Sequence, residues 1–307
     1  MITIQNIKDI LVKNSSELSQ EFKRVFHGRG NYYEGWNFLT IDSIDAILSV
    51  AFYKEFKDED KLFTMLKEFI KDTGHHTIIL QRRYLKNTPT EILTGELKDE
   101  NFAIENGIKL KLNLQNNQNS GYFPDMKNGR KWVKENAKDK NVLNLFSYTC
   151  AFSLFASKGG AIKVTNVDMA KGALSTGREN HHINEIETYN IQFMPYNILK
   201  SFSRIKKNAP YDMIIIDPPT FQKGSFEATN DYQKILRRVD QLSSEDCTVL
   251  ACLNSPDLNS QYLIDLFKEF APNFTFEKRV DNLEEFIAID DERALKNLIF
   301  RKNKAGC

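Results

Sequence analysis

The chain has 307 residues, of which 41% are hydrophobic and 27% charged, and its formal net charge is +1. This is the composition of an ordinary globular protein with enough residues for two domains. A net charge so close to zero excludes an extended basic coat, so any nucleic-acid contact must depend on local basic clusters.

Cysteine and histidine spacing gives no sign of a metal site. The cysteines at positions 150, 247, 252 and 307 form no CxxC or Cys/His pattern, which argues against a zinc site or a disulfide framework. His75–His76 and His181–His182 are adjacent pairs whose side chains point apart, so we expect solvated or capping histidines. No secretory signal and no 18-residue apolar run is visible, and we expect a cytoplasmic protein without a membrane segment.

The first 115 residues predict a small α+β domain. Helical spacing favours helices at residues 16–25 and 58–71, the second ending at Gly74. Strands are expected at residues 38–41, 46–53, 77–82 and 108–112. The polar, turn-rich run over residues 113–121 suggests that a second domain begins near residue 116 and extends to residue 307.

The second half alternates strands with helices. Strands are predicted at residues 141–146, 162–168, 191–194, 211–217 and 248–254, and helices at residues 170–184, 231–242 and 261–270. Two further strands, 274–280 and 298–300, are expected to pair antiparallel at one edge. The predicted fold is therefore α/β: a Rossmann-like, doubly wound, mostly parallel sheet with an antiparallel edge hairpin, joined to the smaller N-terminal α+β domain.

The strand over residues 211–217 ends abruptly at a candidate site. Its non-alternating apolar run is typical of a central strand that is covered on both faces. Pro218 and Pro219 offer no N–H to a sheet ladder, which leaves Asp217 at the carboxyl edge, where open α/β sheets bind ligands. The alternative is an acid that only satisfies backbone amides in a turn.

The loop after the first strand of this sheet indicates the class of ligand. Residues 147–151 contain no glycine, whereas a dinucleotide needs glycines for close approach of its pyrophosphate. A ligand without phosphates, such as S-adenosylmethionine, makes less demand on that approach. Asp168, at the end of the second strand, can accept hydrogen bonds from ribose hydroxyls, and Met169 can lie against adenine. Asp168 is also a candidate helix cap, and the two roles are compatible.

Four motifs occur in the order and spacing of a known family. They are GYFPDMKNGR (121–130), VLNLFSYTCAFSLFA (142–156), NVDMAKGAL (166–174) and DPPTF (217–221). Together they resemble the RlmI/RlmK-type family of class I S-adenosylmethionine-dependent rRNA methyltransferases. The resemblance covers residues 120–255 well and the N-terminal part only loosely.

The resemblance implies a cofactor site built from several segments. Residues near the methionine end would be Phe146, Ser147, Tyr148 and Thr149. Asp168 would bind the ribose, and Met169 and Asn197 would lie at the adenine. Asp217 would lie near the charged groups of the cofactor, and Asp125 and Arg130 belong to a segment that runs past it. Cys150 and Ala151 depart from the family, which commonly has glycine or other very small residues there.

The resemblance also places Pro218 and Phe221 at the acceptor pocket, with Asn254 just beyond the fifth strand. Methylation of a pyrimidine C5 requires a cysteine nucleophile. The cytosine-C5 branch of the family has its cysteine at the position of Asn254, and Cys252 lies two residues early in an apolar strand. Direct transfer to a guanine N7 or an exocyclic amine is therefore favoured over cytosine C5, and the choice between those two acceptors stays open.

We therefore predict methylation of RNA, with an rRNA base as acceptor, S-adenosylmethionine as cofactor and the N-terminal domain presenting the RNA. Aromatic residues that can stack on an extruded base are Tyr122, Phe123 and Phe221. Basic residues that can contact phosphates are Arg82, Arg83, Lys127, Arg130 and Lys131. The alternatives are a methyltransferase for a protein or a small molecule, and a non-catalytic RNA-binding or ribosome-assembly factor.

Overall fold

The computed structural model describes residues 2–15, 19–86, 88–115, 119–219, 221–222 and 226–303, with the side chains of Phe221 and Gln222 excepted. The chain divides into two compact units. The N-terminal unit comprises Met1–Pro124 and Leu283–Asp290, and the C-terminal unit comprises Asp125–Asn282 and Asp291–Cys307. Nothing in the sequence had indicated that the segment at 283–290 returns to the N-terminal unit.

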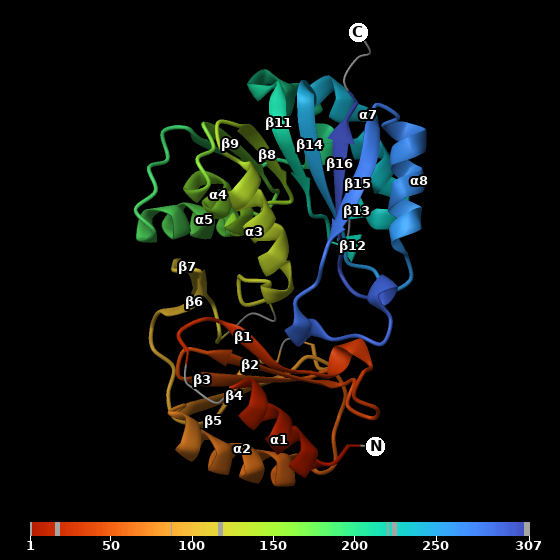
Figure 1. Cartoon of the computed structure of the whole chain (residues 1–307). Helices are drawn as coiled ribbons and strands as arrows, with labels where there is room; N and C mark the ends of the chain where they lie inside the picture. The colour runs from red at the N-terminus through yellow and green to blue at the C-terminus, as the bar shows by residue number, and fades with distance from the viewer. Residues whose placement is uncertain are drawn as a thin grey trace. The chain divides into compact units, whose positions relative to one another are not determined.

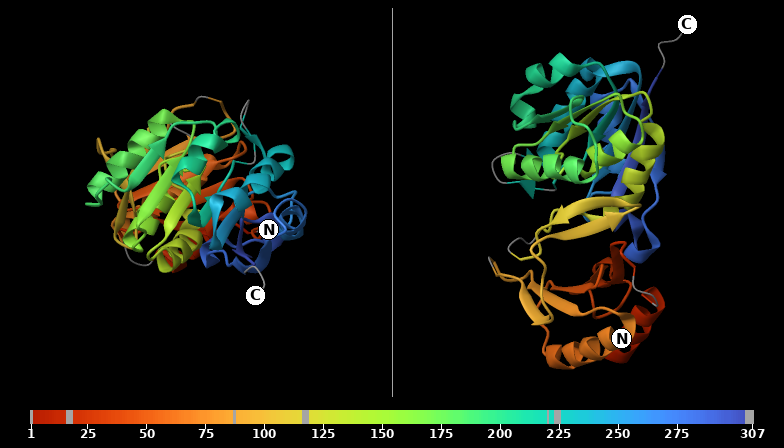
Figure 2. Two further views of the ribbon diagram at one scale, coloured as in Figure 1. Left: turned by 90° about the horizontal axis from the view of Figure 1, so that it is seen from above. Right: turned by 90° about the vertical axis from the view of Figure 1, so that its left-hand side faces the viewer.

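The N-terminal unit is built on a five-stranded sheet with the order β1-β2-β3-β4-β5. Helices α1 and α2 cover one face of it (Figures 1 and 2). Strands β3 and β4 are parallel, and the other neighbours are antiparallel. A separate hairpin of β6 and β7 completes the unit. The elements are α1 (Ile4–Asn14), β1 (Lys23–His27), β2 (Leu39–Ile44), β3 (Ile47–Phe52), α2 (Glu59–Thr73), β4 (Thr77–Arg82), β5 (Glu91–Thr94), β6 (Asn101–Glu105) and β7 (Ile108–Leu112).

The helix predicted at residues 16–25 is wrong where the structure describes it, because residues 19–22 are not helical and the last three residues begin β1. Val25 and Phe26 are buried in the core of the unit, and Phe26 pairs with Ile41 of β2, long-range contacts that helical spacing does not reveal. Residues 16–18 lie outside the described residues. The first helix is instead α1, which begins after Thr3 with a capping box. Gly74 ends α2 at a φ of 79°, as predicted.

The C-terminal unit contains a seven-stranded sheet with the order β10-β9-β8-β11-β14-β16-β15. Its first five strands are parallel, and β16 pairs antiparallel with β14 and with β15. The predicted doubly wound fold with an antiparallel edge hairpin is therefore confirmed. The strands are β8 (Asn141–Leu145), β9 (Lys163–Val167), β10 (Ile191–Met194), β11 (Tyr211–Ile216), β14 (Ser243–Leu253), β15 (Phe274–Val280) and β16 (Lys296–Lys302). A short pair of β12 (Phe221–Gln222) and β13 (Phe226–Glu227) follows β11.

Helices cover both faces of this sheet (Figure 1). On one face α3 and α4 pack against Val142, Met213 and Ile215, and on the other α7 and α8 pack against Leu143, Ile214 and neighbouring residues. Burial on both faces explains why β11 reads as a continuous apolar run. The helices are α3 (Lys127–Asn136), α4 (Ala151–Lys158), α5 (Lys171–Ile183), α6 (Phe202–Ile205), α7 (Ala228–Leu242) and α8 (Ser260–Phe270).

The order of the strands reverses between β8 and β11. From β8 the chain moves outward through β9 to β10, and it then returns to β11 on the other side of β8. The loops that follow β8 and β11 therefore leave the sheet side by side at its carboxyl edge. Such a switch point is where open α/β sheets bind ligands.

Candidate functional site

The loop between β8 and α4 is tightly turned. Three of its non-glycine residues have positive φ angles: Phe146 (58°), Tyr148 (46°) and Cys150 (63°). Each such residue costs on the order of 1–3 kcal/mol, so surrounding contacts must hold the loop in place. Among these, the Cys150 N–H donates to the Ser147 carbonyl at 2.7 Å and the Ser147 N–H to the Val167 carbonyl at 3.2 Å. Strain of this kind gathers where a backbone is shaped for a ligand.

The two departures from the family pattern are accommodated by the structure. Ala151 is the first residue of α4 and needs no glycine conformation there. Cys150 is buried and packs against Gly177 of α5. A β-carbon at position 177 would lie only 2.5 Å from the Cys150 Sγ. The loop can therefore carry a cysteine in place of glycine, because the glycine in the facing helix leaves space for its side chain. Burial raises the pKa of the Cys150 thiol to about 12, so it is a neutral packing group.

Asp168 joins this loop to the next crossover. One of its carboxylate oxygens accepts from the Tyr148 N–H at 2.9 Å, and the other accepts from the Ala170 N–H at 2.8 Å. The acid thus fixes the loop after β8 and the backbone just before α5 together. Each oxygen keeps a further lone pair that can accept from a hydroxyl.

A pocket at the carboxyl edge brings together four of the predicted cofactor residues. It is lined by Phe146, Asp168, Met169, Tyr196, Asn197, Ile198 and Leu199. Met169 is 45% exposed, and the Asn197 side chain accepts from the Lys200 N–H at 3.3 Å. Ser147 and Thr149 are buried, at 6% and 4% exposure, and are not part of this lining.

A chain of buried polar side chains lies beneath the loop, and sequence analysis did not identify it. The Asn144 amide donates to Asn166, and the Asn166 amide donates to Ser153. His181 contacts Ser153 through Nε2 at 2.9 Å and the Gly177 carbonyl through Nδ1 at 2.7 Å. A carbonyl only accepts, so Nδ1 carries the proton and Ser153 donates to Nε2.

His181 is therefore not the solvated or capping residue that we expected. It is fully buried, and burial lowers its pKa, which keeps the ring neutral. His75 of the N-terminal unit is also buried, with Ser43 at 2.8 Å from its Nε2. Spacing along the chain could not reveal the burial of either histidine, because Ser153 and Ser43, which contact their Nε2 atoms, come from distant elements.

Asp217 lies at the end of β11 in an unusual electrostatic environment. Burial is the main cause that raises its pKa to about 7; the nearby Asp125 carboxylate raises it further, and the Arg130 guanidinium opposes the rise. Arg130 is only 2% exposed, with its guanidinium 5.8 Å from the Phe155 ring. Its predicted role as a surface phosphate contact is therefore wrong, because α3 carries this side chain into the interior. A carboxyl with a pKa near 7 can accept or release a proton at neutral pH.

The neighbouring strand ends beside Asp217. The register pairs Ile216 with Ala251, so Asp217 is level with Cys252. Cys252 is 1% exposed, and burial followed by the Asp217 and Asp125 carboxylates raises its pKa well above the usual range. This thiol is a buried neutral group, as expected. Tyr232 of α7 donates to the Cys252 carbonyl at 3.3 Å and bridges the ends of β11 and β14.

Three predicted acceptor residues follow these strands. Pro218 is buried after Asp217, and Asn254 is exposed directly after β14 ends at Leu253. Phe221 begins β12, but its side chain and Thr220 lie outside the described residues.

Two residues expected to contact RNA have other roles. Tyr122 is 4% exposed in the N-terminal unit, where its hydroxyl donates to Glu105 at 2.8 Å. Arg82 pairs with Glu59 and Glu91 at 2.7 Å each. The acids come from α2 and β5, so only the fold could show that this arginine is engaged. Phe123 is 43% exposed.

The described residues contain no group of three or more His, Cys, Asp or Glu side chains that could hold a metal ion. Within the same part of the chain, no helix combines the length and the apolar character needed to cross a membrane.

A sequence profile described as S-adenosylmethionine-dependent methyltransferase matches residues 23–301. A Bacillus subtilis protein, provisionally named ribosomal RNA large subunit methyltransferase YwbD, is 29% identical over 89% of this chain and 70% of its own length. Ribosomal RNA large subunit methyltransferase I of Aeromonas salmonicida is 36% identical over 44% of this chain. This chain spans only 35% of the length of the Aeromonas protein. The resemblance identified from the four motifs is confirmed.

The fold is also shared with solved structures. SMU.776, a provisionally assigned methyltransferase solved as a complex with SAH, superposes with a TM-score of 0.86. It is 23% identical, and the alignment covers 98% of this chain and 82% of that one. At this level of identity the likeness establishes the fold.

Proposed function

The chain belongs to the S-adenosylmethionine-dependent methyltransferase family, and from that premise we propose that it methylates a base of large-subunit rRNA by direct transfer, without a covalent bond between enzyme and base. The names of the relatives support the class of substrate. The observation that carries direct transfer is that the described residues offer no usable thiol at the acceptor edge. Cys252 is buried with a raised pKa, and Asn254 occupies the position where a nucleophile would be needed.

We assign the adenosine part of the cofactor to the pocket after β8, β9 and β10. Asp168 offers lone pairs at its mouth for ribose hydroxyls, while Met169 and Phe146 offer apolar surface for a base. Asn197 can contact the edge of the adenine. When bound, S-adenosylmethionine supplies an electrophilic methyl group attached to a sulfonium. We assign Ser147, Tyr148 and Thr149 to holding the loop that faces its methionine part, and Asp125 and Arg130 to setting the charge around Asp217.

Asp217, Pro218 and Phe221 form the proposed wall of the acceptor pocket, with Asn254 opposite. An ionised Asp217 favours a positive charge nearby, and it can also accept hydrogens from an exocyclic amine. A guanine N7 presents a lone pair and needs no base, so in that case Asp217 only positions the groups. We therefore propose guanine N7 or an exocyclic amine as the acceptor, in preference to cytosine C5.

The proposed partner is RNA, and we assign its presentation to the N-terminal unit. In that unit, the exposed ring of Phe123 suits stacking on an unpaired base. In the C-terminal unit, Lys127 and Lys131 of α3 suit phosphate contacts.

The decisive experiment compares rRNA from cells with and without the protein by mass spectrometry of nucleosides, followed by mapping of the modified position. We expect one methylated base to disappear on deletion and to return with the wild-type protein but not with Asp217→Ala. An unchanged rRNA profile, with normal S-adenosylmethionine binding by calorimetry, would redirect the search to protein or small-molecule acceptors. A methylated cytosine C5 would refute direct transfer.

A further inference from the structure

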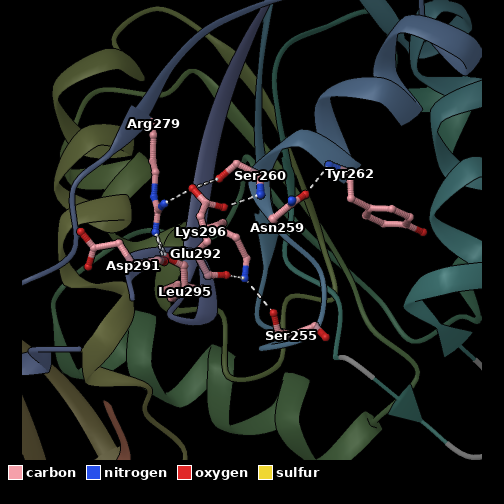
Figure 3. Close-up of polar contacts among 9 residues, drawn as sticks. All are labelled: Ser255, Asn259, Ser260, Tyr262, Arg279, Asp291, Glu292, Leu295 and Lys296. Carbon is pink, nitrogen blue, oxygen red and sulfur yellow. Dashed lines mark hydrogen bonds and ion pairs between the residues drawn. The ribbon is translucent and has the colours of Figure 1, made fainter. Parts of the chain in front are cut away.

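A polar cluster on β15, β16 and the connection between them holds the segment that follows β14. Figure 3 shows its central side chains, Arg279, Glu292 and Lys296, which we call the Lys296 clamp. The segment they hold, residues 254–259, connects β14 to α8 and is called here the β14–α8 connection. It begins with Asn254 and leaves the sheet at the same edge as Asp217.

Lys296 holds the start of this connection. The residue is fully buried on β16, opposite Leu253 of β14. Its Nζ donates to the Ser255 carbonyl at 2.7 Å and to the Glu292 carbonyl at 2.8 Å (Figure 3). The ammonium therefore fixes the backbone one residue beyond Asn254.

Glu292 holds the other end. Its carboxylate accepts from the Ser260 N–H at 2.6 Å and from the Ser260 hydroxyl at 3.0 Å, at the start of α8. Arg279 orients that carboxylate through a contact of 2.9 Å. Arg279 also donates to the carbonyls of Asp291 at 2.7 Å and Leu295 at 3.0 Å, which keeps the turn before β16 in place. The β14–α8 connection is thus held at both ends by one cluster.

A buried ammonium is a costly way to gain stability. Its desolvation cost is large, and well-packed apolar side chains of similar volume are often as stable or more stable in such positions. The ammonium instead adds geometric specificity, because its N–H groups hold the carbonyls to which they donate in fixed positions. A site that must place an acceptor atom accurately gains from this, since a misplacement of about 1 Å can lower the rate about a hundredfold.

We propose that Lys296 is a positioning residue for the methyl acceptor, and that with Glu292 and Arg279 it fixes the β14–α8 connection, so that Asn254 and the Ser255 backbone form a rigid wall opposite Asp217. The proposal rests on the proposed function, because it assumes that the acceptor enters between these two segments. Lys296 does not touch the acceptor itself. It acts through the backbone that it holds.

The test uses the full-length protein with Lys296→Met, which removes the ammonium and keeps the length of the side chain. Lys302→Met is the matched control, since Lys302 lies on the same strand and pairs with Asp240 at 3.1 Å, far along β16 from the clamp. Three quantities are measured: hydrogen exchange of the 254–262 amides, affinity for S-adenosylmethionine, and kcat and KM for methyl transfer to rRNA purified from cells lacking the protein.

In Lys296→Met we expect exchange over residues 254–262 to become at least about tenfold faster, while the cofactor affinity stays within about twofold. We expect kcat to fall by about 10- to 100-fold without a matching loss of thermal stability. Lys302→Met should change neither exchange in this segment nor kcat. A purely structural lysine would instead lower stability, cofactor affinity and turnover together.

The proposal is overturned if kcat and KM stay within about twofold of wild type in folded Lys296→Met, or if exchange over residues 254–262 does not change. If this variant fails to fold, the same measurements are made on Glu292→Gln, which alters the partly exposed carboxylate that accepts from Ser260. The results that support or overturn the proposal are the same. If wild-type protein transfers no methyl group to the rRNA, the proposed function fails. The exchange experiment still decides whether the clamp holds the segment.

Discussion

Replacing Asp217 by asparagine should stabilise the C-terminal unit at alkaline pH while impairing methyl transfer. Burial, with the Asp125 carboxylate adding to it, raises the pKa of Asp217 from 3.8 to about 7. The folded state therefore holds a proton that the unfolded state releases, and this stabilising contribution is lost as the pH rises toward the folded pKa. At about 1.4 kcal/mol per pH unit, the loss reaches at most about 4 kcal/mol above pH ~7.

The side-chain amide in the Asp217→Asn variant does not titrate, so this variant avoids the loss. Relative to wild type, its free energy of unfolding should increase by roughly 3 kcal/mol between pH ~5 and pH ~8. The chain has two tryptophans, Trp36 in the N-terminal unit and Trp132 in the C-terminal unit, both buried. Urea unfolding in a Trp36→Phe background, followed by tryptophan fluorescence, therefore reports on the C-terminal unit alone.

The matched control is Asp257→Asn, which removes the same charge from an exposed position in the same unit. The electrostatic account of Asp217 is wrong if the stability difference between Asp217→Asn and wild type is the same at both pH values. On the functional side, we expect Asp217→Asn to lower kcat/KM by about 10- to 100-fold, because the carboxylate no longer faces the reacting groups. Full turnover in this variant would remove Asp217 from the acceptor site.

Three further predictions concern the loop after β8 and the thiol at the end of β14. Gly177→Ala should destabilise the protein by about 1–3 kcal/mol, because the new methyl group would lie 2.5 Å from the Cys150 Sγ. Adding Cys150→Gly to this variant should restore most of the lost stability, as measured by thermal unfolding. Asp168→Ala should weaken S-adenosylmethionine binding at least about tenfold by calorimetry, since the Tyr148 N–H loses its acceptor and, in the proposed binding mode, the ribose hydroxyls lose theirs. An unchanged affinity would place the ribose elsewhere. Cys252→Ala should keep methyl transfer within about threefold of wild type, whereas loss of activity with retained folding would revive a covalent route.

The elements of the C-terminal unit were largely predictable because their signals are local. A central parallel strand such as β11 is apolar on both faces, and the proline pair fixes where it ends. Strand β1 was missed for the opposite reason, since Val25 and Phe26 are buried only in the core of the folded N-terminal unit and the strand pairs with β2, which lies more than ten residues further along the chain. Arg82 was assigned to phosphates because the sequence does not show that Glu59 and Glu91 flank it.

Local patterns in the chain were enough to predict the doubly wound sheet, the family and the acids at the carboxyl ends of β9 and β11. These follow from apolar runs, prolines and short motifs, which are properties of neighbouring residues. Three features are visible only in the folded chain: Gly177 makes room for Cys150, His181 is a buried neutral group, and Lys296 holds the segment after β14. Each of these depends on which distant elements become neighbours, and that is settled by packing and hydrogen bonding across the whole fold.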